Sequence, residues 1–174
     1  ASEAKKNGLR VTTEVTAAHL AFSEEKLGDF DTNFKLMPPL RTEENRKALI
    51  AALKDGKIDV ISSDHSPEDE EHKKLEFDLA NFGIAGMELF FPMVFGAVGN
   101  EIPLDELVAK FSTSPREILG IDVPVIGEGE KANLTVFSIE ESADLGKHQT
   151  KGYNVPTLQE PLKGKVIRTL HTNL

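Results

Sequence analysis

A carboxylate and an imidazole stand side by side directly after a short apolar segment. Asp64 and His65 follow residues 58–62 (IDVIS), whose composition predicts a short buried β-strand. In a fold of alternating strands and helices, the carboxyl ends of the strands form the active face. A carboxylate there can bind a divalent metal or take a proton from metal-bound water. The pattern alone favours the alternative that Asp64 caps the next turn and that His65 is a surface residue.

A second candidate is His19, which follows a predicted strand over residues 9–15. A metal ligand would lie at that position, but so would an ordinary loop histidine, which is the interpretation that His19 alone favours. The other histidines lie in charged or polar surroundings that are typical of solvated side chains; they are His72, His148 and His171. No two histidines are spaced as His-x-His or as a helical i, i+4 pair. A zinc site needs three or four ligands, and the chain does not visibly supply them by itself.

Two loops could approach a ligand. Pro38 and Pro39 hold residues 34–41 in an irregular conformation, in which Lys35 and Arg41 either meet an anion or are solvated cations. The segment 83–86 (GIAG) either lets the backbone approach a ligand or forms a tight turn.

The elements that would position these residues alternate between strand and helix up to Gly120. Helices are predicted over residues 42–54, 86–99 (with Pro92 inside and a kink), 103–111 and 114–119. A charged loop is predicted over residues 68–74, with a solvated face over residues 68–71. After Gly120 the chain is rich in Gly, Pro and acidic residues, and strands are predicted over residues 134–139 and 164–170. We therefore place a boundary at Gly120, with an α/β part over residues 1–120 and a small β part over residues 121–174. Two or three strand–helix units cannot close a barrel of eight, so the chain is expected to be the last part of a larger fold.

Composition excludes several classes of function. The chain has 20 Lys and Arg against 29 Asp and Glu, and this net charge of −9 argues against binding to nucleic acid or to an anionic membrane surface. The absence of Cys excludes disulfides and thiolate chemistry, and a reducing compartment, the cytoplasm, is the expected location. No apolar run is long enough to span a membrane, and no signal peptide opens the chain.

Five segments together resemble one family, and they occur in the family's order. They are residues 11–20 (VTTEVTAAHL), 35–41 (KLMPPLR), 58–67 (IDVISSDHSP), 82–88 (FGIAGME) and 112–120 (STSPREILG). This set is similar to class I dihydroorotase, in the branch of cyclic amidohydrolases that also contains allantoinase and dihydropyrimidinase. The resemblance implies the last βα units of a metal-dependent (β/α)₈ TIM-type barrel, plus part of a small C-terminal β-sandwich domain.

The resemblance also implies roles for matching residues. Asp64 matches an aspartate that contacts the metal and moves a proton to the amide nitrogen, and His65 matches a supporting histidine beside it. The backbone at Gly83 and Ile84 matches a segment that contacts the substrate ring. The implied cofactor is one or two zinc ions in the full-length protein, and the implied substrate is a small cyclic amide, interconverted with its open form in pyrimidine biosynthesis. The implied assembly is a homodimer.

Three positions depart from the family pattern. Met37 replaces an asparagine and Glu68 replaces a histidine, both expected to contact substrate, and Ala18 replaces the first histidine of a pair. Lost charge-assisted contacts are worth about 1.5–3 kcal/mol each, so two would weaken dihydroorotate binding by roughly a hundredfold or more.

These departures leave two alternatives to a dihydroorotase. One is a hydrolase for another cyclic amide or ureide. The other is a non-catalytic dihydroorotase-like partner in an assembly, such as one with aspartate transcarbamoylase. The family's remaining metal ligands would precede Ala1, so the 174 residues by themselves are expected to bind metal weakly and to be inactive.

Overall fold

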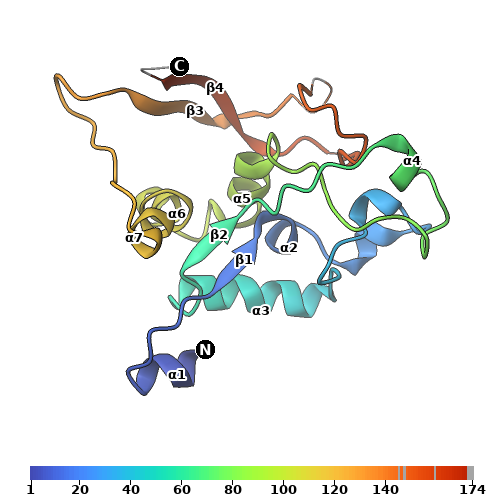
Figure 1. Ribbon diagram of the computed structural model, residues 1–174, viewed down its shortest axis with the longest axis horizontal. Helices are drawn as coiled ribbons and strands as arrows, with labels where there is room; N and C mark the ends of the chain where they lie inside the picture. The colour runs from blue at the N-terminus through green and yellow to red at the C-terminus, as the bar shows by residue number, and fades with distance from the viewer. Residues whose placement is uncertain (145, 147, 159, 172–174) are drawn as a thin grey trace.

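A pair of short parallel strands forms the centre of the fold (Figure 1). The structure is a computed structural model that describes residues 1–144, 146, 148–158 and 160–171. Strand β1 (Glu14–Thr16) pairs with β2 (Val60–Ser62), and Thr16 lies opposite Ser62. Both strands are shorter than predicted. Residues 9–13 are not assigned to the strand, although the Thr13 carbonyl still accepts hydrogen bonds from the backbone of Asp59 and Val60.

Helices cover one face of this strand pair, and the central residue of each strand is buried on that face. Val15 and Ile61 are buried, and they belong to the same apolar core as residues of helices α2 (Ala17–Ala21) and α3 (Glu43–Lys54). Helix α3 begins as predicted, because the Thr42 hydroxyl accepts a hydrogen bond from the backbone N–H of Asn45 at 3.3 Å. Two 3₁₀ turns, η1 (Glu24–Leu27) and η2 (Thr32–Phe34), connect α2 to the proline loop before α3.

The apolar helix α5 (Phe90–Val98) is shorter than the predicted helix over residues 86–99. Residues 87–89 form a turn instead, which places Pro92 in the first helical turn. Backbone N–H groups there have no partner within the helix, so proline costs no hydrogen bond and a kink is not required. Two further helices follow close to the predicted positions, α6 (Leu104–Phe111) and α7 (Thr113–Leu119).

The prediction of a charged loop over residues 68–74 is wrong in its centre. Helix α4 (Glu70–Lys73) lies there, and the Asp69 side chain caps it by accepting the His72 N–H at 3.0 Å. Lys73 is only 1% exposed, so one charge of this segment is inside the protein.

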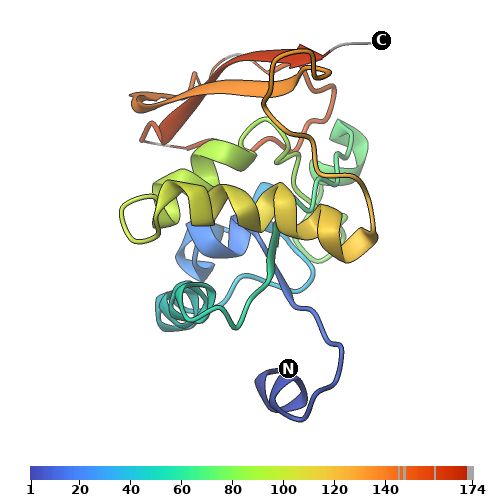
Figure 2. The same cartoon turned by 90° about the vertical axis from the view of Figure 1, so that its left-hand side faces the viewer.

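After Gly120 the described residues contain one antiparallel strand pair, β3 (Asn133–Ser142) and β4 (Lys163–His171). Its strands are longer than predicted, and it packs against α5 through Phe137 and Phe91, whose ring centroids are 4.5 Å apart. Both views show this pair on the side of the molecule remote from the N-terminal helix α1 (Ser2–Lys6) (Figures 1 and 2). Within the described residues, no helix is long and apolar enough to cross a membrane.

Burial predicts a large difference in stability effect between a leucine of α6 and a leucine of α7. Leu107 in α6 is fully buried, whereas Leu119 at the end of α7 is 70% exposed. We expect Leu107→Ala to lower the free energy of unfolding by about 2–4 kcal/mol, because it removes buried methyl groups and leaves a cavity. Leu119→Ala serves as the control and should change it by less than about 0.5 kcal/mol. Urea denaturation of both variants measures the difference, and equal losses would contradict this packing.

Candidate active site

Asp64 lies two residues beyond β2, at the edge where β1 and β2 both end. Its backbone has φ of +47°, a left-handed conformation that non-glycine residues adopt rarely and aspartate more readily than most. Its side chain is exposed, and no hydrogen bond or ion pair joins it to another described residue. Strained backbone of this kind is concentrated at functional sites. The structure thus holds a free carboxylate at the carboxyl edge of the parallel strands.

The segment after Asp64 lies beside the glycine segment. His65 forms a parallel bridge with Ile84, and the Ser66 N–H donates to the Ile84 carbonyl at 2.9 Å. The Nδ1 atom of His65 accepts the Met87 N–H at 3.2 Å, so in the neutral ring the proton is on Nε2. The structure therefore places His65, which follows Asp64 directly, beside Ile84.

Gly83 is required by a close approach of two backbones. Its φ is +132°, and a Cβ at this position would lie 2.7 Å from the Ser66 carbonyl oxygen. Any side chain would push the two segments apart. This packing reason for glycine stands beside the predicted contact with a substrate ring.

The proline loop and the end of β1 meet the same edge. The Lys35 carbonyl accepts the Gly83 N–H at 2.9 Å, and Met37, which precedes Pro38, is largely exposed. His19 lies between the two, with Nδ1 at 2.7 Å from the Thr16 hydroxyl and Nε2 at 3.0 Å from the Pro38 carbonyl oxygen. Both ring nitrogens of His19 are therefore occupied by protein atoms, which fits the loop histidine better than a metal ligand.

Lys35 does not point its charge at a ligand. It is buried, and its ammonium donates to the carbonyls of Asp78 at 3.0 Å and Ala80 at 2.6 Å. The same ammonium lies 4.6 Å from the centre of the Phe82 ring, within the range of a cation–π contact. The expectation that Lys35 meets an anion, or is a solvated cation, is therefore corrected: it holds the loop that leads to Gly83.

Lys73 holds the same loop further along. Its ammonium donates to the carbonyls of Asn81 at 2.8 Å and Gly83 at 3.2 Å. Burial lowers the pKa of Lys73 below its usual value, the Glu68 carboxylate opposes this shift, and the neighbouring Lys35 adds to it. Two buried ammonium groups thus take up backbone carbonyls of residues 78–83.

Glu68 lies at the other end of the Asp64 segment and is half-buried. Its carboxylate accepts a hydrogen bond from the Asn81 side chain at 3.0 Å and also favours the charged form of Lys73. Its role as a substrate-contacting residue, like those of Met37, Gly83 and Ile84, stays a prediction.

Sequence reasoning missed the part that the C-terminal segment plays at this edge. The Glu88 carboxylate accepts the backbone N–H groups of Gln149 at 2.9 Å and Thr150 at 2.7 Å. The hydrogen bond from Gln149 is the largest cause that lowers the pKa of Glu88. Asn154, further along, is fully buried beside residues 66–68. No periodicity or motif points to these contacts, and the boundary placed at Gly120 separates them from the site.

The described residues do not fit a complete metal site. Among residues 1–144, 146, 148–158 and 160–171, no group of three or more His, Cys, Asp or Glu side chains could hold a metal ion. Asp64 offers one carboxylate, His19 is engaged, and Ala18 is a buried side chain without a ligand atom. A zinc centre needs three or four ligands, so this part of the chain does not form one by itself.

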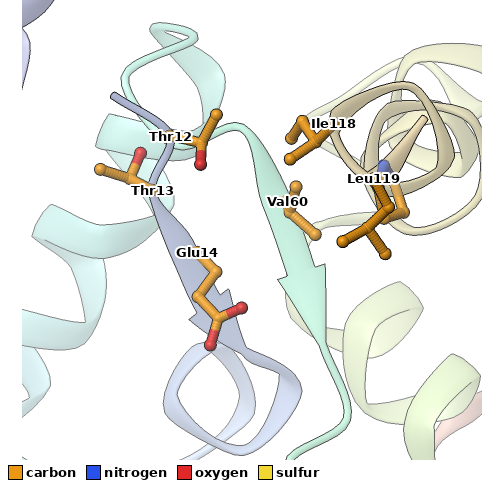
Figure 3. Close-up of a pocket in the computed structure, with 7 residues that line it drawn as sticks. Thr12, Thr13, Glu14, Val60, Ile118 and Leu119 are labelled. Carbon is orange, nitrogen blue, oxygen red and sulfur yellow. The ribbon is translucent and has the colours of Figure 1, made fainter. Parts of the chain in front are cut away.

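A hollow of about 360 Å³ lies at the opposite edge of the strands (Figure 3). It is lined by Thr12, Thr13, Glu14, Val60, Pro115, Ile118 and Leu119. Glu14 and Val60 are the first residues of their strands, so the hollow is at the amino ends, away from Asp64. In folds of this class, active sites form at the carboxyl ends, and we do not assign the hollow to the candidate site.

Comparisons with known proteins agree on one family. The profile of the Amidohydrolase family matches residues 1–168. The chain is 39% identical over 158 residues to a dihydroorotase of Bacillus subtilis, covering 88% of this chain and 37% of that protein. It is 40% identical over 172 residues to a dihydroorotase of a Thermoanaerobacter species, covering 97% of this chain and 40% of that protein.

Solved structures support the fold. A D-hydantoinase (dihydropyrimidinase) from a Thermus species superposes with a TM-score of 0.84 at 21% identity, over 98% of this chain and 40% of that one. The dihydropyrimidinase from Brevibacillus agri gives 0.81 at 24% identity, with the same coverage. At these identities the likeness concerns the fold alone. The chain spans about 40% of the length of the relatives it matches.

The buried lysine predicts a distinct pH dependence of stability. Because the folded pKa of Lys73 is below the usual 10.5, the unfolded chain binds more protons between the two values. Lys73 therefore makes the free energy of unfolding rise with pH in the window just below pH 10.5. We expect Lys73→Met to flatten this rise, as measured by urea denaturation across that window.

Lys74→Met is the matched control, because Lys74 is exposed and a hydrogen bond to Glu70 raises its pKa. Its contribution is present below pH 10.5 and is lost above it, so the slope below pH 10.5 should stay as in the parent protein. A Lys73→Met variant with the parent slope would contradict a lowered pKa.

Proposed function

The chain belongs to the Amidohydrolase family and shares its TIM-barrel-type fold, and from this premise we propose that it forms part of a hydrolase that opens a cyclic amide, as a dihydroorotase does. The observation that carries the proposal is the free carboxylate of Asp64 at the carboxyl edge of two parallel strands. The dihydroorotase relatives, 39–40% identical over most of this chain, support the same reaction class.

Asp64 would act by moving one proton. Ring opening adds water to a carbonyl carbon, breaks the carbon–nitrogen bond and leaves a nitrogen that must gain a proton. A carboxylate beside the ring can take the proton from the attacking water and give it to the departing nitrogen. In this proposal Gly83 and Ile84 flank the ring from the neighbouring segment, and His65 fixes that segment through Met87.

Zinc, the cofactor expected for this family, would supply an activated water, with Asp64 as one candidate ligand. The described residues alone do not complete such a centre. In this proposal the role of this chain is the Asp64 carboxylate, which takes and gives the proton at the strand edge.

We propose finer assignments on the same basis. The parallel pair β1–β2 and its helices would be the last units of the barrel, and residues 121–174 would contribute to a small β-sandwich. The boundary at Gly120 is supported by the exposed residues 120–131 that follow α7. The assembled protein would be a homodimer.

A second candidate function is a non-catalytic partner in an assembly, such as one with aspartate transcarbamoylase. Ala18, which replaces a histidine of the family pattern, is buried and has no ligand atom. Met37 offers no hydrogen bond comparable to that of the asparagine expected there. These two positions support a protein that keeps the amidohydrolase fold without its reaction.

The proposed reaction is tested by Asp64→Asn in the protein that carries this chain. We expect kcat for dihydroorotate hydrolysis to fall by about 10²–10⁴-fold, because the amide cannot accept the proton. Asp29→Asn, at an exposed loop residue, is the control and should leave kcat unchanged. Full turnover in Asp64→Asn would remove Asp64 from the mechanism. A parent protein that turns over neither dihydroorotate nor hydantoin would favour the non-catalytic candidate.

The choice of substrate is tested at Glu68. If Glu68 faces an anionic substrate, Glu68→Gln removes a repulsion and keeps an oxygen that can accept the Asn81 hydrogen bond. We expect kcat/KM for dihydroorotate to rise about tenfold, equal to about 1.4 kcal/mol, while kcat/KM for uncharged hydantoin stays constant. Equal effects on both substrates would show that Glu68 does not face the substrate's charge.

A further inference from the structure

Asn154 is a polar side chain with no exposure to solvent, and it is satisfied entirely by the Asp64 segment. Its Oδ1 accepts the Glu68 N–H at 2.8 Å, and its Nδ2 donates to the Ser66 carbonyl at 2.9 Å. The side-chain amide thus takes the place of a backbone neighbour for the Ser66 carbonyl and the Glu68 N–H, two and four residues after Asp64. Buried backbone groups that lose such a partner are costly.

The backbone around Asn154 holds a second segment at the same time. The Asn154 carbonyl accepts the Ala85 N–H at 3.0 Å, and the Tyr153 N–H donates to the Glu68 carbonyl at 2.7 Å. Gly152 allows this approach, because a Cβ there would lie 2.8 Å from the Pro67 Cβ and 3.3 Å from the Ala85 Cβ. Residues 152–154 therefore lie against both the segment after Asp64 and the segment after Ile84.

We propose that Asn154 is a positioning residue that holds the Asp64 segment in register with the Gly83–Ile84 segment. The inference rests on the proposed function of that edge, and it makes residues 152–154 of the C-terminal part a component of the site. Asn154 does not touch reacting atoms in this proposal. It acts through the backbone of residues 66–68, which follows directly on the left-handed conformation of Asp64. A strained residue persists only where its surroundings fix it.

The test is amide hydrogen exchange in the protein that carries this chain, with kinetics as a second readout. In Asn154→Ala we expect the Glu68 and Ala85 amides to exchange about tenfold faster or more. The Glu68 N–H loses its side-chain acceptor, and the Ala85 N–H bonds the carbonyl of a residue 154 that its side chain no longer anchors. Amides inside α3 should keep their protection, since the hydrogen bonds of Asn154 go to residues 66, 68 and 85 instead.

Asn81→Ala is the matched control. The Asn81 side chain also bonds Glu68, but at the side-chain carboxylate rather than at the backbone N–H. Its removal should leave exchange at Glu68 and Ala85 unchanged. Asn154→Ser keeps a shorter polar group without adding a buried charge, so it gives an intermediate effect and serves if Asn154→Ala does not fold.

Kinetics separate positioning from general stability. If positioning matters, kcat falls about tenfold in Asn154→Ala with a smaller change in KM, and kcat in Asn154→Ser lies between the values of the parent protein and Asn154→Ala. Unchanged exchange at Glu68 and Ala85, equal acceleration throughout α3, or full kcat despite lost protection would each overturn the proposal. If the parent protein shows no turnover but Asn154→Ala still loses protection at Glu68 and Ala85, Asn154 holds the two segments and the proposed reaction is refuted.

Discussion

The parallel pairing of β1 with β2 is the constraint on which the candidate site depends. Because Thr16 lies opposite Ser62, the chain leaves both strands at one edge, and His19 and Asp64 follow there. An antiparallel pair would send the two segments to opposite edges. The pairing is fixed by burial, since Val15 and Ile61 face the helices, and a slip by one residue would turn them toward the open face.

The sequence predicts those elements whose ends and faces are set by neighbouring residues, such as a helix with its own cap. Thr42 and the apolar spacing that follows it specify α3, which begins where the sequence indicates. Residues 11–13 have β-branched side chains, but only Thr13 makes backbone hydrogen bonds to the neighbouring segment. A strand needs a neighbour as well as a propensity. The charged residues 68–74 predict a loop, and the burial of Lys73 does not follow from them, because backbone carbonyls elsewhere in the chain accept its ammonium.

The place of Asp64 could be predicted because a strand end is a local feature and because the surrounding motif is specific. The hold of Asn154 on residues 66–68 could not, because it joins positions 86 and 88 residues apart. An asparagine after a glycine and a tyrosine reads as an ordinary turn residue. The same holds for Glu88, whose partners Gln149 and Thr150 lie beyond the boundary at Gly120.

The two segments of the site are secured by interactions of different kinds. The ammonium groups of Lys35 and Lys73 donate to four backbone carbonyls of residues 78–83. Burying these charges is costly, which is why the pKa of Lys73 is lowered. Residues 66–68 are held instead by the neutral amide of Asn154, which does not titrate. Because the folded pKa of Lys73 is lowered, the charge of this lysine opposes folding just below pH 10.5. The Asn154 amide holds residues 66–68 with no charge to bury, so a change in pH acts on the hold of Lys73 and not on that of Asn154.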